Sequence, residues 1–562
     1  MALGLRIIDL PRFPAGFTAD EAAQGYTAYS ILKTGKDEWG VKFPLNPRSF
    51  GDFKAPLQTY LMIPSIAVFG LNEFSVRLPN AVLGSLAVLM VYFLVKELFS
   101  PALIRIDPRI NPNDLALLSS LFLAISPWHI CLSRGAFEAN LTTFFLPLAI
   151  FLFLKGIHTR GSLFMILSSV IFGLNLFTYH SAKLLSPLIF FPLFFFFRKK
   201  FFGQRNNHIL IYDSALIIFG IFLGLAGFSF LKGGGTRAGD IGLFSGGWQA
   251  VANQRYFATL QGFPDFLARL FNNKLTFILA EFVKNDLSYL SPQFLFTQGA
   301  GEATYGMLPG RGVLYLFEMP FVLAAFYSLF KQRSFSLVFL WFWVLLSPIS
   351  AALARGVGYH ANRVAVMTPA IQIISAYGGI KFLQWIKVKF NKNRQMVILS
   401  FCYIVILTSF LFFLEDYFFQ APKINAPKMS YGWRQAMDYL NIQKGAEKII
   451  ISRSFSEPQA FVMFYDKIDP KIVQLQTKPW LGYQKSGYFV DQLGSYSLEN
   501  YEFRNFSFPE DWQRKNIILV GMEKDFLGQE KIIQEKELKG EIKEKKIIPY
   551  PDSKVAFDII GL

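Results

Sequence analysis

The chain has 562 residues, of which 52% are hydrophobic and only 17% are charged, and its mean hydropathy is +0.34. A soluble protein of this size would have nowhere to bury so much apolar surface, so the composition excludes an ordinary water-soluble enzyme and indicates lipid as the solvent for much of the chain. The net charge of +17 is explained first by membrane topology and does not indicate a nucleic-acid partner.

Ten apolar stretches along the chain are long enough for us to predict that each crosses the membrane. They are 78–97, 114–131, 139–155, 162–179, 184–197, 209–230, 312–330, 335–353, 363–382 and 396–414. The sequence therefore predicts an all-α polytopic membrane protein with about 10 or 11 spans, whose transmembrane domain covers residues 1–414.

Short basic loops alternate with the other connections between these spans. The basic loops are 96–113, 155–162, 198–208, 331–334 and 381–395, with 16 Lys and Arg in about 56 residues. The positive-inside rule assigns this set to the cytoplasm. The remaining loops and everything after residue 415 are then extracytoplasmic, which predicts an integral protein of the cytoplasmic membrane.

The N-terminus is the one segment that does not fit this pattern. The stretch "MALGLRIIDL" is too short to span a bilayer and too short for a signal peptide with its own apolar region. Because residues 9–77 are predicted to be outside, we expect residues 1–8 to be the tail of a first helix that a late start has cut off.

The first outer loop, 9–77, carries an acidic pair and an isolated lysine. Asp20 and Glu21 begin a helix-like stretch, where acidic side chains also stabilise the helix N-terminus. Lys54 stands before a proline and could be an interfacial lysine with its charge in water. Composition alone leaves open whether these charges are structural or chemical. Arg77, at the end of the loop, is expected to pin the loop to the membrane surface.

Other outer loops bring further polar side chains to the same face of the membrane. His129, Arg134 and Glu138 lie in "SPWHICLSRGAFEANL", His180 and Lys183 in "TYHSAKLLSP", and His360 and Arg363 in "ARGVGYHANRV". A single histidine there is ordinarily an interfacial hydrogen-bonding group. Several such loops at one level predict a shared cavity in which cations bind a phosphate and a carboxylate acts as a general base.

The large outer loop, 231–311, contains amphipathic stretches that are expected to lie in the membrane interface and to form a mobile cover over the site. Its glycine run, 233–235, has no following Gly-Lys-Ser/Thr, so it is interpreted as a connector as readily as a phosphate-binding loop. No ligand spacing calls for a metal.

Residues 415–562 differ in composition from the rest of the chain, because charge rises and long apolar runs stop. Short β-rich runs at 448–452 and 516–521, and a hairpin around Pro551, Asp552 and Ser553, predict a small extracytoplasmic α/β domain. We expect this domain to contact an acceptor or to pack on the outer loops.

Four stretches, in order, resemble a known family: "PAGFTADEAAQGYTAYSILKTGKDEWG", "GDFKAPLQTYL", "NEFSVRLPNAVLG" and "SPWHICLSRGAFEANL". They are similar to the C-type (GT-C) membrane glycosyltransferases, and more narrowly to the bacterial protein O-mannosyltransferases and lipid A aminoarabinose transferases of the glycosyltransferase family 39 type. The acidic pair is the most specific mark, and Ala55 stands where a proline is common.

This resemblance implies an inverting transferase that uses a polyprenyl-phosphate sugar as donor. Asp20 would be the base, while Glu21 and Glu138 would orient the acceptor or the loop. Lys54, His360 and Arg363 would bind the donor phosphate, with His180 and Lys183 also on the donor side and Arg134 a candidate for either task. Some related enzymes use a divalent metal. The acceptor could be a lipid, a glycan or a protein.

Two other functions remain open from the sequence. A transporter or flippase for a lipid-linked or small solute would also be a polytopic membrane protein. Transporters tend to carry polar or broken helices near the midplane, whereas the spans here are nearly free of charge and the polar groups gather at one face. A non-catalytic relative is a weaker alternative, because Asp20, Lys54 and Glu138 are all present.

Overall fold

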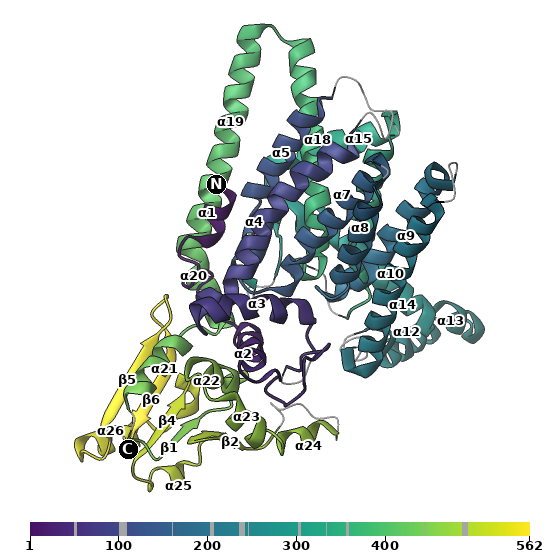
Figure 1. The fold of residues 1–562 in the computed structure, drawn as a ribbon. Coiled ribbons are helices and arrows are strands. Elements are labelled where there is room, and N and C mark those ends of the chain that lie inside the picture. The colour runs from purple at the N-terminus through teal and green to yellow at the C-terminus, as the bar shows by residue number, and fades with distance from the viewer. Residues whose placement is uncertain are drawn as a thin grey trace.

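The computed structural model describes residues 1–49, 53–100, 110–159, 161–202, 207–234, 242–245, 247–301, 305–332, 334–355, 359–443, 445–485 and 493–562. The predicted basic loops fall partly on residues outside these ranges, as does Gly235 of the glycine run. A helical bundle and a smaller domain containing a β-sheet make up the molecule (Figure 1).

The bundle contains helices from residues 73–415 of the chain. They are α4 (Glu73–Leu98), α5 (Pro112–Ile125), α6 (Pro127–Arg134), α7 (Thr142–Thr159), α8 (Ser162–Asn175), α9 (His180–Phe202), α10 (Asn207–Ser229), α15 (Met319–Gln332), α16 (Phe335–Leu346), α17 (Ile349–Ala352), α18 (Thr368–Lys389) and α19 (Lys392–Glu415). The short N-terminal helix α1 (Ala2–Ile7) lies against this bundle near α4 and α6.

Each of the ten predicted spans coincides with one of these helices or with a broken pair of them. Within the described residues, seven helices are long and apolar enough to cross a membrane, or eight if the bent pair α5–α6 forms one span. That pair bends by 57° at Ser126, because Pro127 begins the second helix and has no backbone N–H to continue the first. The predicted all-α polytopic membrane fold is confirmed, and the chain is an integral membrane protein.

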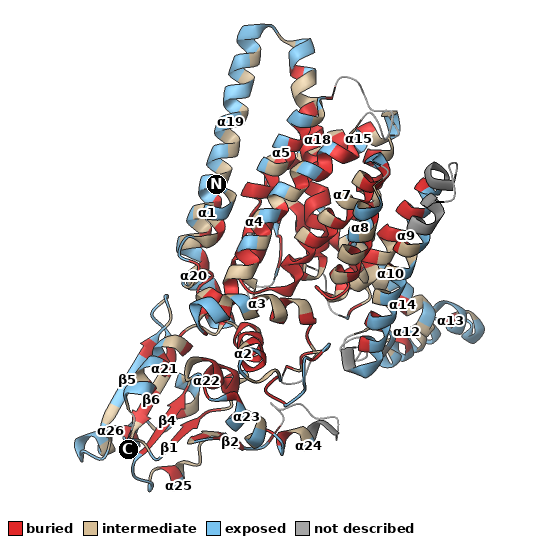
Figure 2. Ribbon diagram, viewed as in Figure 1, coloured by how far each residue is buried: buried red, intermediate tan, exposed pale blue. Residues whose placement is uncertain are grey.

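Burial differs sharply between two neighbouring helices of the bundle. Most of α18 is enclosed by other helices, whereas α19 exposes apolar side chains such as Phe401, Ile404 and Phe412 along nearly its whole length (Figure 2). Such a surface is stable only in lipid. The turn that joins these two helices lies at the end of the bundle opposite the β-sheet (Figure 1).

Two helices lie between the bundle and the sheet, and three more lie to one side, near the lower end of α10 (Figure 1). They are α2 (Ala19–Thr34), α3 (Pro56–Phe69), α12 (Trp248–Leu260), α13 (Asp265–Phe271) and α14 (Lys274–Tyr289). The last three expose many large apolar side chains, including Phe257, Phe266 and Leu275, in keeping with the amphipathic pattern of the large outer loop.

The C-terminal domain is built on a six-stranded sheet with the order β2-β3-β1-β4-β6-β5. Its strands are β1 (Lys448–Ile451), β2 (Tyr496–Leu498), β3 (Tyr501–Phe503), β4 (Ile517–Gly521), β5 (Glu544–Pro549) and β6 (Val555–Gly561). Its helices are α21 (Trp433–Ile442), α22 (Pro458–Tyr465), α23 (Pro470–Gln476), α24 (Trp480–Lys485), α25 (Phe508–Asp511) and α26 (Glu530–Leu538).

The predicted strands are confirmed as β1 and β4, which pair in parallel, and the predicted hairpin is the antiparallel pair β5–β6. The strands β2 and β3 were not predicted, because each has only three residues and shows no extended alternation.

One hydrophobic core joins the first outer loop to the C-terminal domain. It contains Phe17 and Tyr26 of the loop together with Trp433 and Phe464 of the domain. The rings of Phe17 and Phe464 lie 4.8 Å apart, and the Tyr26 hydroxyl donates to the carbonyl of Ile468 at 2.7 Å. Because side chains of both parts pack in this shared core, the two parts hold each other in place.

Candidate active site

A cavity of about 430 Å³ lies where residues of α2, of the C-terminal domain and of the bundle-helix ends on the side of the β-sheet meet. Its lining residues are Thr18, Ala19, Asp20, Gln24, Lys54, Ala136, Phe137, Glu138, Tyr179, Tyr305, Asn362, Lys428, Ser430, Ser456 and Glu457. Three of the predicted site residues are therefore brought together: Asp20 and Lys54 from the first outer loop, and Glu138 from a loop 84 residues after Lys54.

Asp20 and Lys54 form an ion pair at the edge of this cavity. The Lys54 ammonium lies 2.8 Å from the Asp20 carboxylate, and the side chains are 9% and 47% exposed. Asp20 occupies the first turn of α2, whose start is fixed by a capping box between Thr18 and Glu21. Lys54 precedes Ala55, the N-cap of α3, and α3 begins with Pro56 at a position where proline is favoured.

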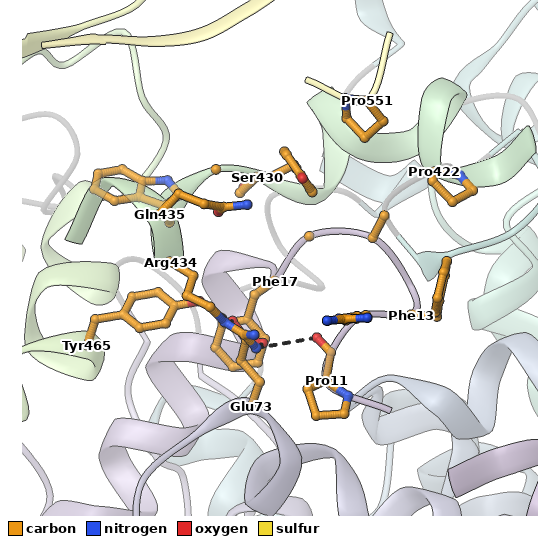
Figure 3. A pocket seen from close by; sticks show the side chains of 16 residues that line it. Pro11, Phe13, Phe17, Glu73, Pro422, Ser430, Arg434, Gln435, Tyr465 and Pro551 are labelled. Atoms are coloured by element: carbon orange, nitrogen blue, oxygen red, sulfur yellow. Dashed lines mark hydrogen bonds and ion pairs between the residues drawn. The ribbon is translucent and has the colours of Figure 1, made fainter. Parts of the chain in front are cut away.

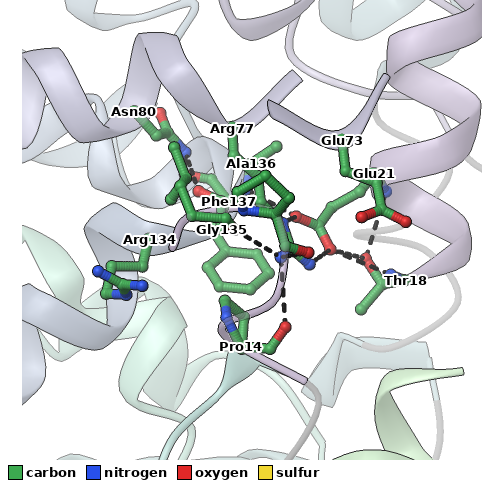
Figure 4. Close-up of polar contacts among 12 residues, drawn as sticks. Pro14, Thr18, Glu21, Glu73, Arg77, Asn80, Arg134, Gly135, Ala136 and Phe137 are labelled. Atoms are coloured by element: carbon green, nitrogen blue, oxygen red, sulfur yellow. Dashed lines mark hydrogen bonds and ion pairs between the residues drawn. The ribbon is translucent and has the colours of Figure 1, made fainter. Parts of the chain in front are cut away.

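Glu138 reaches the cavity through a buried asparagine network. The amide of Asn80 on α4 donates to the carbonyls of Gly135 and Phe137, at 2.7 and 3.0 Å (Figure 4). The Asn80 side chain is fully buried. Asn140 donates back to the carbonyl of Asn80 at 3.0 Å. These bonds fix the turn before the short helix Glu138–Asn140, so the carboxylate is held against the cavity.

Glu21 lies away from the cavity in a fully buried pair with Arg77 (Figure 4). Arg77 Nε lies 2.8 Å from Glu21 Oε1, and Arg77 Nη2 lies 3.1 Å from Glu21 Oε2. The backbone N–H of Ala136 also donates to Glu21 Oε1 at 3.0 Å. Glu21 therefore joins α2 to α4 and to the loop of Glu138, which corresponds to the loop-orienting alternative of the sequence analysis.

Arg77 also binds the backbone of the chain segment that leads into α2. Its guanidinium donates to the carbonyls of Leu10, Pro14 and Gly16 at 3.1, 3.2 and 2.5 Å. Every one of these contacts is internal, so Arg77 acts within the first outer loop and pins it to α4.

Arg134 does not line the cavity, although the sequence made it a candidate for binding substrate. It is fully buried and donates to the carbonyls of Leu5 and Ile8 at 2.7 and 2.6 Å, while its guanidinium lies over the ring of Tyr417. Because it is buried and its hydrogen-bond acceptors are main-chain carbonyls, Arg134 holds the N-terminal segment against the bundle. The spacing of Arg134 and Glu138 in sequence could not reveal this, because Gly135 turns the chain between them.

The four other predicted cations flank the cavity and are not among its lining residues. His180 and Lys183 lie in the first turn of α9, and His360 and Arg363 lie in the segment before α18. Their neighbours Tyr179 and Asn362 line the cavity instead, joined by a 3.2 Å hydrogen bond from the Asn362 amide to the Tyr179 hydroxyl. Sequence reasoning identified these two loops but selected the charged residues over the neutral ones.

The sequence led us to expect the C-terminal domain to contact an acceptor or to pack on the outer loops, but it did not identify the residues with which this domain lines the cavity. Lys428 and Ser430 follow α19, and Ser456 and Glu457 precede α22. Ser430 and Glu457 both have left-handed backbone conformations, with φ of 52° and 51°. The only sequence signal for this wall is the cluster of Ser, Glu and Pro at 454–458, which is too common a turn pattern to single out.

A second cavity of about 310 Å³ lies on the other side of Ser430 (Figure 3). Here Arg434 Nε lies 3.0 Å from the Glu73 carboxylate at the start of α4, and the Tyr465 hydroxyl also donates to Glu73. This cluster joins α4 to α21 and α22, so it helps to dock the C-terminal domain on the bundle.

A further acidic pair, Asp37–Glu38, lies where the first outer loop meets α23. Burial raises the pKa of Asp37 to about 6, although backbone N–H groups and Arg48 oppose the shift. Burial, and then the nearby Asp37, raise the pKa of Glu38 well above its usual value. The Gln474 amide donates to the Asp37 carbonyl at 2.9 Å, so this pair lies at the contact with the C-terminal domain.

The described residues contain no group of three or more His, Cys, Asp or Glu side chains that could hold a metal ion. The charges that face the cavity are carboxylates and amines. Such groups can bind an anion and accept a proton.

Comparison with known proteins identifies the class of fold. Residues 53–224 match the family model described as dolichyl-phosphate-mannose-protein mannosyltransferase. ArnT from Cupriavidus metallidurans bound to undecaprenyl phosphate superposes with a TM-score of 0.52 at 11% identity, over 100% of this chain and 96% of that one. The apo state of the same protein gives 0.51 at 11% identity, over the same shares.

The YkcB protein of Bacillus subtilis (strain 168), which carries a mannosyltransferase name, is 27% identical over 144 residues. This match covers 26% of the chain and spans only 18% of that protein's length. The resemblance predicted from the sequence is confirmed as a likeness of fold and of part of the sequence: the chain has the GT-C membrane fold of ArnT, and residues 53–224 are similar to the protein mannosyltransferase family model.

Proposed function

We propose that the chain is an inverting glycosyltransferase, which moves a sugar from a polyprenyl-phosphate donor to an acceptor hydroxyl at the extracytoplasmic face of the membrane. The observation that carries the proposal is the Asp20–Lys54 pair in the cavity at the outer end of the bundle. Undecaprenyl phosphate bound to a protein of the same fold, ArnT, supports a lipid phosphate as one ligand.

The two members of the pair have separate tasks in the proposed reaction. Lys54 binds a phosphate oxygen and offsets the charge that grows there as the bond to the anomeric carbon breaks. Asp20 takes the proton of the acceptor hydroxyl while the acceptor oxygen forms its bond to the anomeric carbon. The bonding electrons leave with the lipid phosphate, and attack from the opposite side inverts the anomeric centre.

The ion pair between Lys54 and Asp20 explains why both charges are tolerated in a partly buried site before donor binds. Each compensates the other, and a phosphate that enters takes over Lys54 and leaves Asp20 to act as a base. Glu138 is held on the same wall, where it can orient the acceptor. The donor sugar and the acceptor remain to be identified by assay.

The test uses purified protein in nanodiscs with polyprenyl-phosphate sugars labelled in the sugar, and envelope extract as acceptor. Release of polyprenyl phosphate together with transfer of label is expected, and Asp20→Asn should lower the rates of both about 10²–10⁴-fold. Movement of the intact lipid across a bilayer, with no release of phosphate under any acceptor, would contradict the proposal and support a flippase.

The side of the membrane is tested separately. A reporter fused after Lys392, in the turn between α18 and α19, should be cytoplasmic, and one fused at the C-terminus should be extracytoplasmic. A cytoplasmic C-terminus would put the cavity on the wrong side and overturn the assignment of the face.

A further inference from the structure

We propose that the C-terminal domain supplies the acceptor subsite of the cavity, and that Glu457, with Ser456, binds the hydroxyl groups of a carbohydrate acceptor. This inference rests on the proposed transferase function and names the substrate class of the same cavity. It concerns residues that lie more than 400 positions after Asp20 in the sequence.

The two walls of the cavity have different chemistry. The membrane-side wall includes the aromatic side chains of Phe137, Tyr179 and Tyr305, and the rings of Phe137 and Tyr305 meet edge to face at 5.0 Å. The C-terminal wall contributes only polar side chains: the Lys428 amine, the Ser430 and Ser456 hydroxyls and the Glu457 carboxylate. Aromatic faces opposite a few placed polar groups are the ordinary composition of a small-molecule site.

The polar wall matches hydroxyl groups better than it matches an apolar or purely anionic ligand. A carboxylate only accepts hydrogen bonds, an ammonium only donates them, and serine does both. A carbohydrate presents hydroxyls that donate and accept at several positions, so each of these groups can find a partner. The cavity volume of about 430 Å³ lies within the range of sites for small ligands.

Geometry assigns this wall to the acceptor and not to the donor. Glu457 immediately precedes α22, and α22 packs against α2, the helix whose first turn contains Asp20 (Figure 1). Gly25 shows how close this packing is, because a Cβ there would meet Val76 and the Phe464 ring at 2.6 and 2.9 Å. The wall is therefore attached to the base, whereas Lys54 belongs to the segment entering α3. An acceptor molecule whose reacting hydroxyl contacts Asp20 therefore extends along the cavity toward Glu457.

The backbone of the wall is held in an uncommon conformation by its surroundings. Glu457 has φ 51° and ψ 51°, and the helix that follows is buried from Pro458 to Phe464. Trp433 stacks on Phe461 at 4.6 Å, which fixes α22 on the sheet side. Non-glycine residues keep such a conformation only where the packing imposes it, and they concentrate at functional sites.

The test separates donor and acceptor kinetics on the full chain in nanodiscs. Hydrolysis of a labelled undecaprenyl-phosphate sugar, with water as acceptor, gives the KM for the donor. Transfer of the label to octyl glycosides of glucose, mannose and N-acetylglucosamine gives the KM for the acceptor. A peptide rich in Ser and Thr is the alternative acceptor.

Glu457→Gln should raise the KM for the best octyl glycoside about tenfold, the cost of losing a hydrogen bond to a charged group, with less than a twofold change in the KM for donor. Ser456→Ala should act in the same direction by a few fold. The matched control is Glu510→Gln, an exposed carboxylate of the same domain outside the cavity, which should change neither KM.

Three outcomes overturn the inference. A rise in the KM for donor alone in both variants would assign the wall to the donor sugar. Transfer to the peptide and to no glycoside would replace the carbohydrate with a polypeptide. Normal acceptor kinetics in both variants would remove the wall from the site. Wild-type protein that neither hydrolyses the donor nor transfers the sugar would instead refute the proposed function, and this inference with it.

Discussion

The rim of the cavity and the network directly behind it contain the same kind of interaction and serve opposite purposes. At the rim, Asp20 pairs with Lys54 and keeps 47% of its side chain exposed. Behind it, Glu21 pairs with Arg77 and neither side chain is exposed. A partly exposed pair can exchange its partner for a substrate at small cost, whereas a fully buried pair cannot be opened without stranding a charge.

The comparison shows why two adjacent acids do not share a task. Successive residues of a helix point about 100° apart, so Asp20 and Glu21 leave the same first turn toward different surroundings. The direction of Asp20 leads to the cavity, and that of Glu21 leads to α4. The following predictions, from the largest expected effect to the smallest, break or sharpen this contrast.

Asp20→Asn should lower turnover about 10²–10⁴-fold, because the amide keeps the size of the side chain but cannot accept the acceptor's proton. Thermal stability and membrane insertion should stay close to wild type. The measurement is sugar transfer at saturating donor, with the melting temperature recorded alongside. Near-normal turnover would reduce Asp20 to a helix-terminal charge.

Glu21→Gln should destabilise the protein by about 3–5 kcal/mol, because it leaves the Arg77 guanidinium buried without a counter-charge. The measurement is thermal unfolding in detergent, with Glu510→Gln as an exposed control that should shift the transition little. Activity should fall only as far as the folded fraction falls. A stable but inactive Glu21→Gln protein would exchange the roles of the two acids.

The double variant Glu21→Gln with Arg77→Met sharpens this test. Removal of both charges should recover only part of the lost stability, because the carbonyls of Leu10, Pro14 and Gly16 also lose their donor. Full recovery would mean that the charge pair alone, and not the network, accounts for the effect.

Lys54→Ala should weaken binding of undecaprenyl phosphate about 10–100-fold, the usual cost of losing a hydrogen bond to a charged group. Lys42→Ala, at an exposed lysine of the same outer loop, is the matched control and should bind normally. Binding can be followed by the ligand-induced rise in melting temperature. Equal binding by both variants would move the phosphate site away from Lys54.

The Asp37–Glu38 pair predicts a smaller, pH-dependent contribution to stability. Its carboxyls have raised pKa values in the folded protein, so folding is favoured while they are protonated, and that contribution is lost as the pH rises through about 6, the pKa of Asp37. Wild type should therefore lose about 2 kcal/mol relative to Asp37→Asn between pH 4.5 and pH 7.5. Parallel melting curves for the two proteins across this range would contradict the assignment.

The sequence by itself determined the parts of this protein that depend on local composition. The lengths of the apolar runs located the membrane helices, because a span needs about 20 apolar residues. The end of such runs after residue 415 indicated the C-terminal domain. Motif and family resemblance also singled out Asp20, Lys54 and Glu138, and all three line one cavity in the structure. The short strands β2 and β3 could not be predicted, because three residues are too few to show the alternation of a β-strand.

Only the tertiary structure decided which charges face the cavity. By residue type alone, Arg134 could bind a phosphate and Glu21 could act as a base. Packing instead buries both side chains against internal partners. Glu457 enters the site because α22 packs against α2 across more than 400 residues of sequence. Burial and side-chain direction depend on contacts between residues that are distant along the chain. They determine the local dielectric and the partners of each charge, and so whether that charge is structural or reactive.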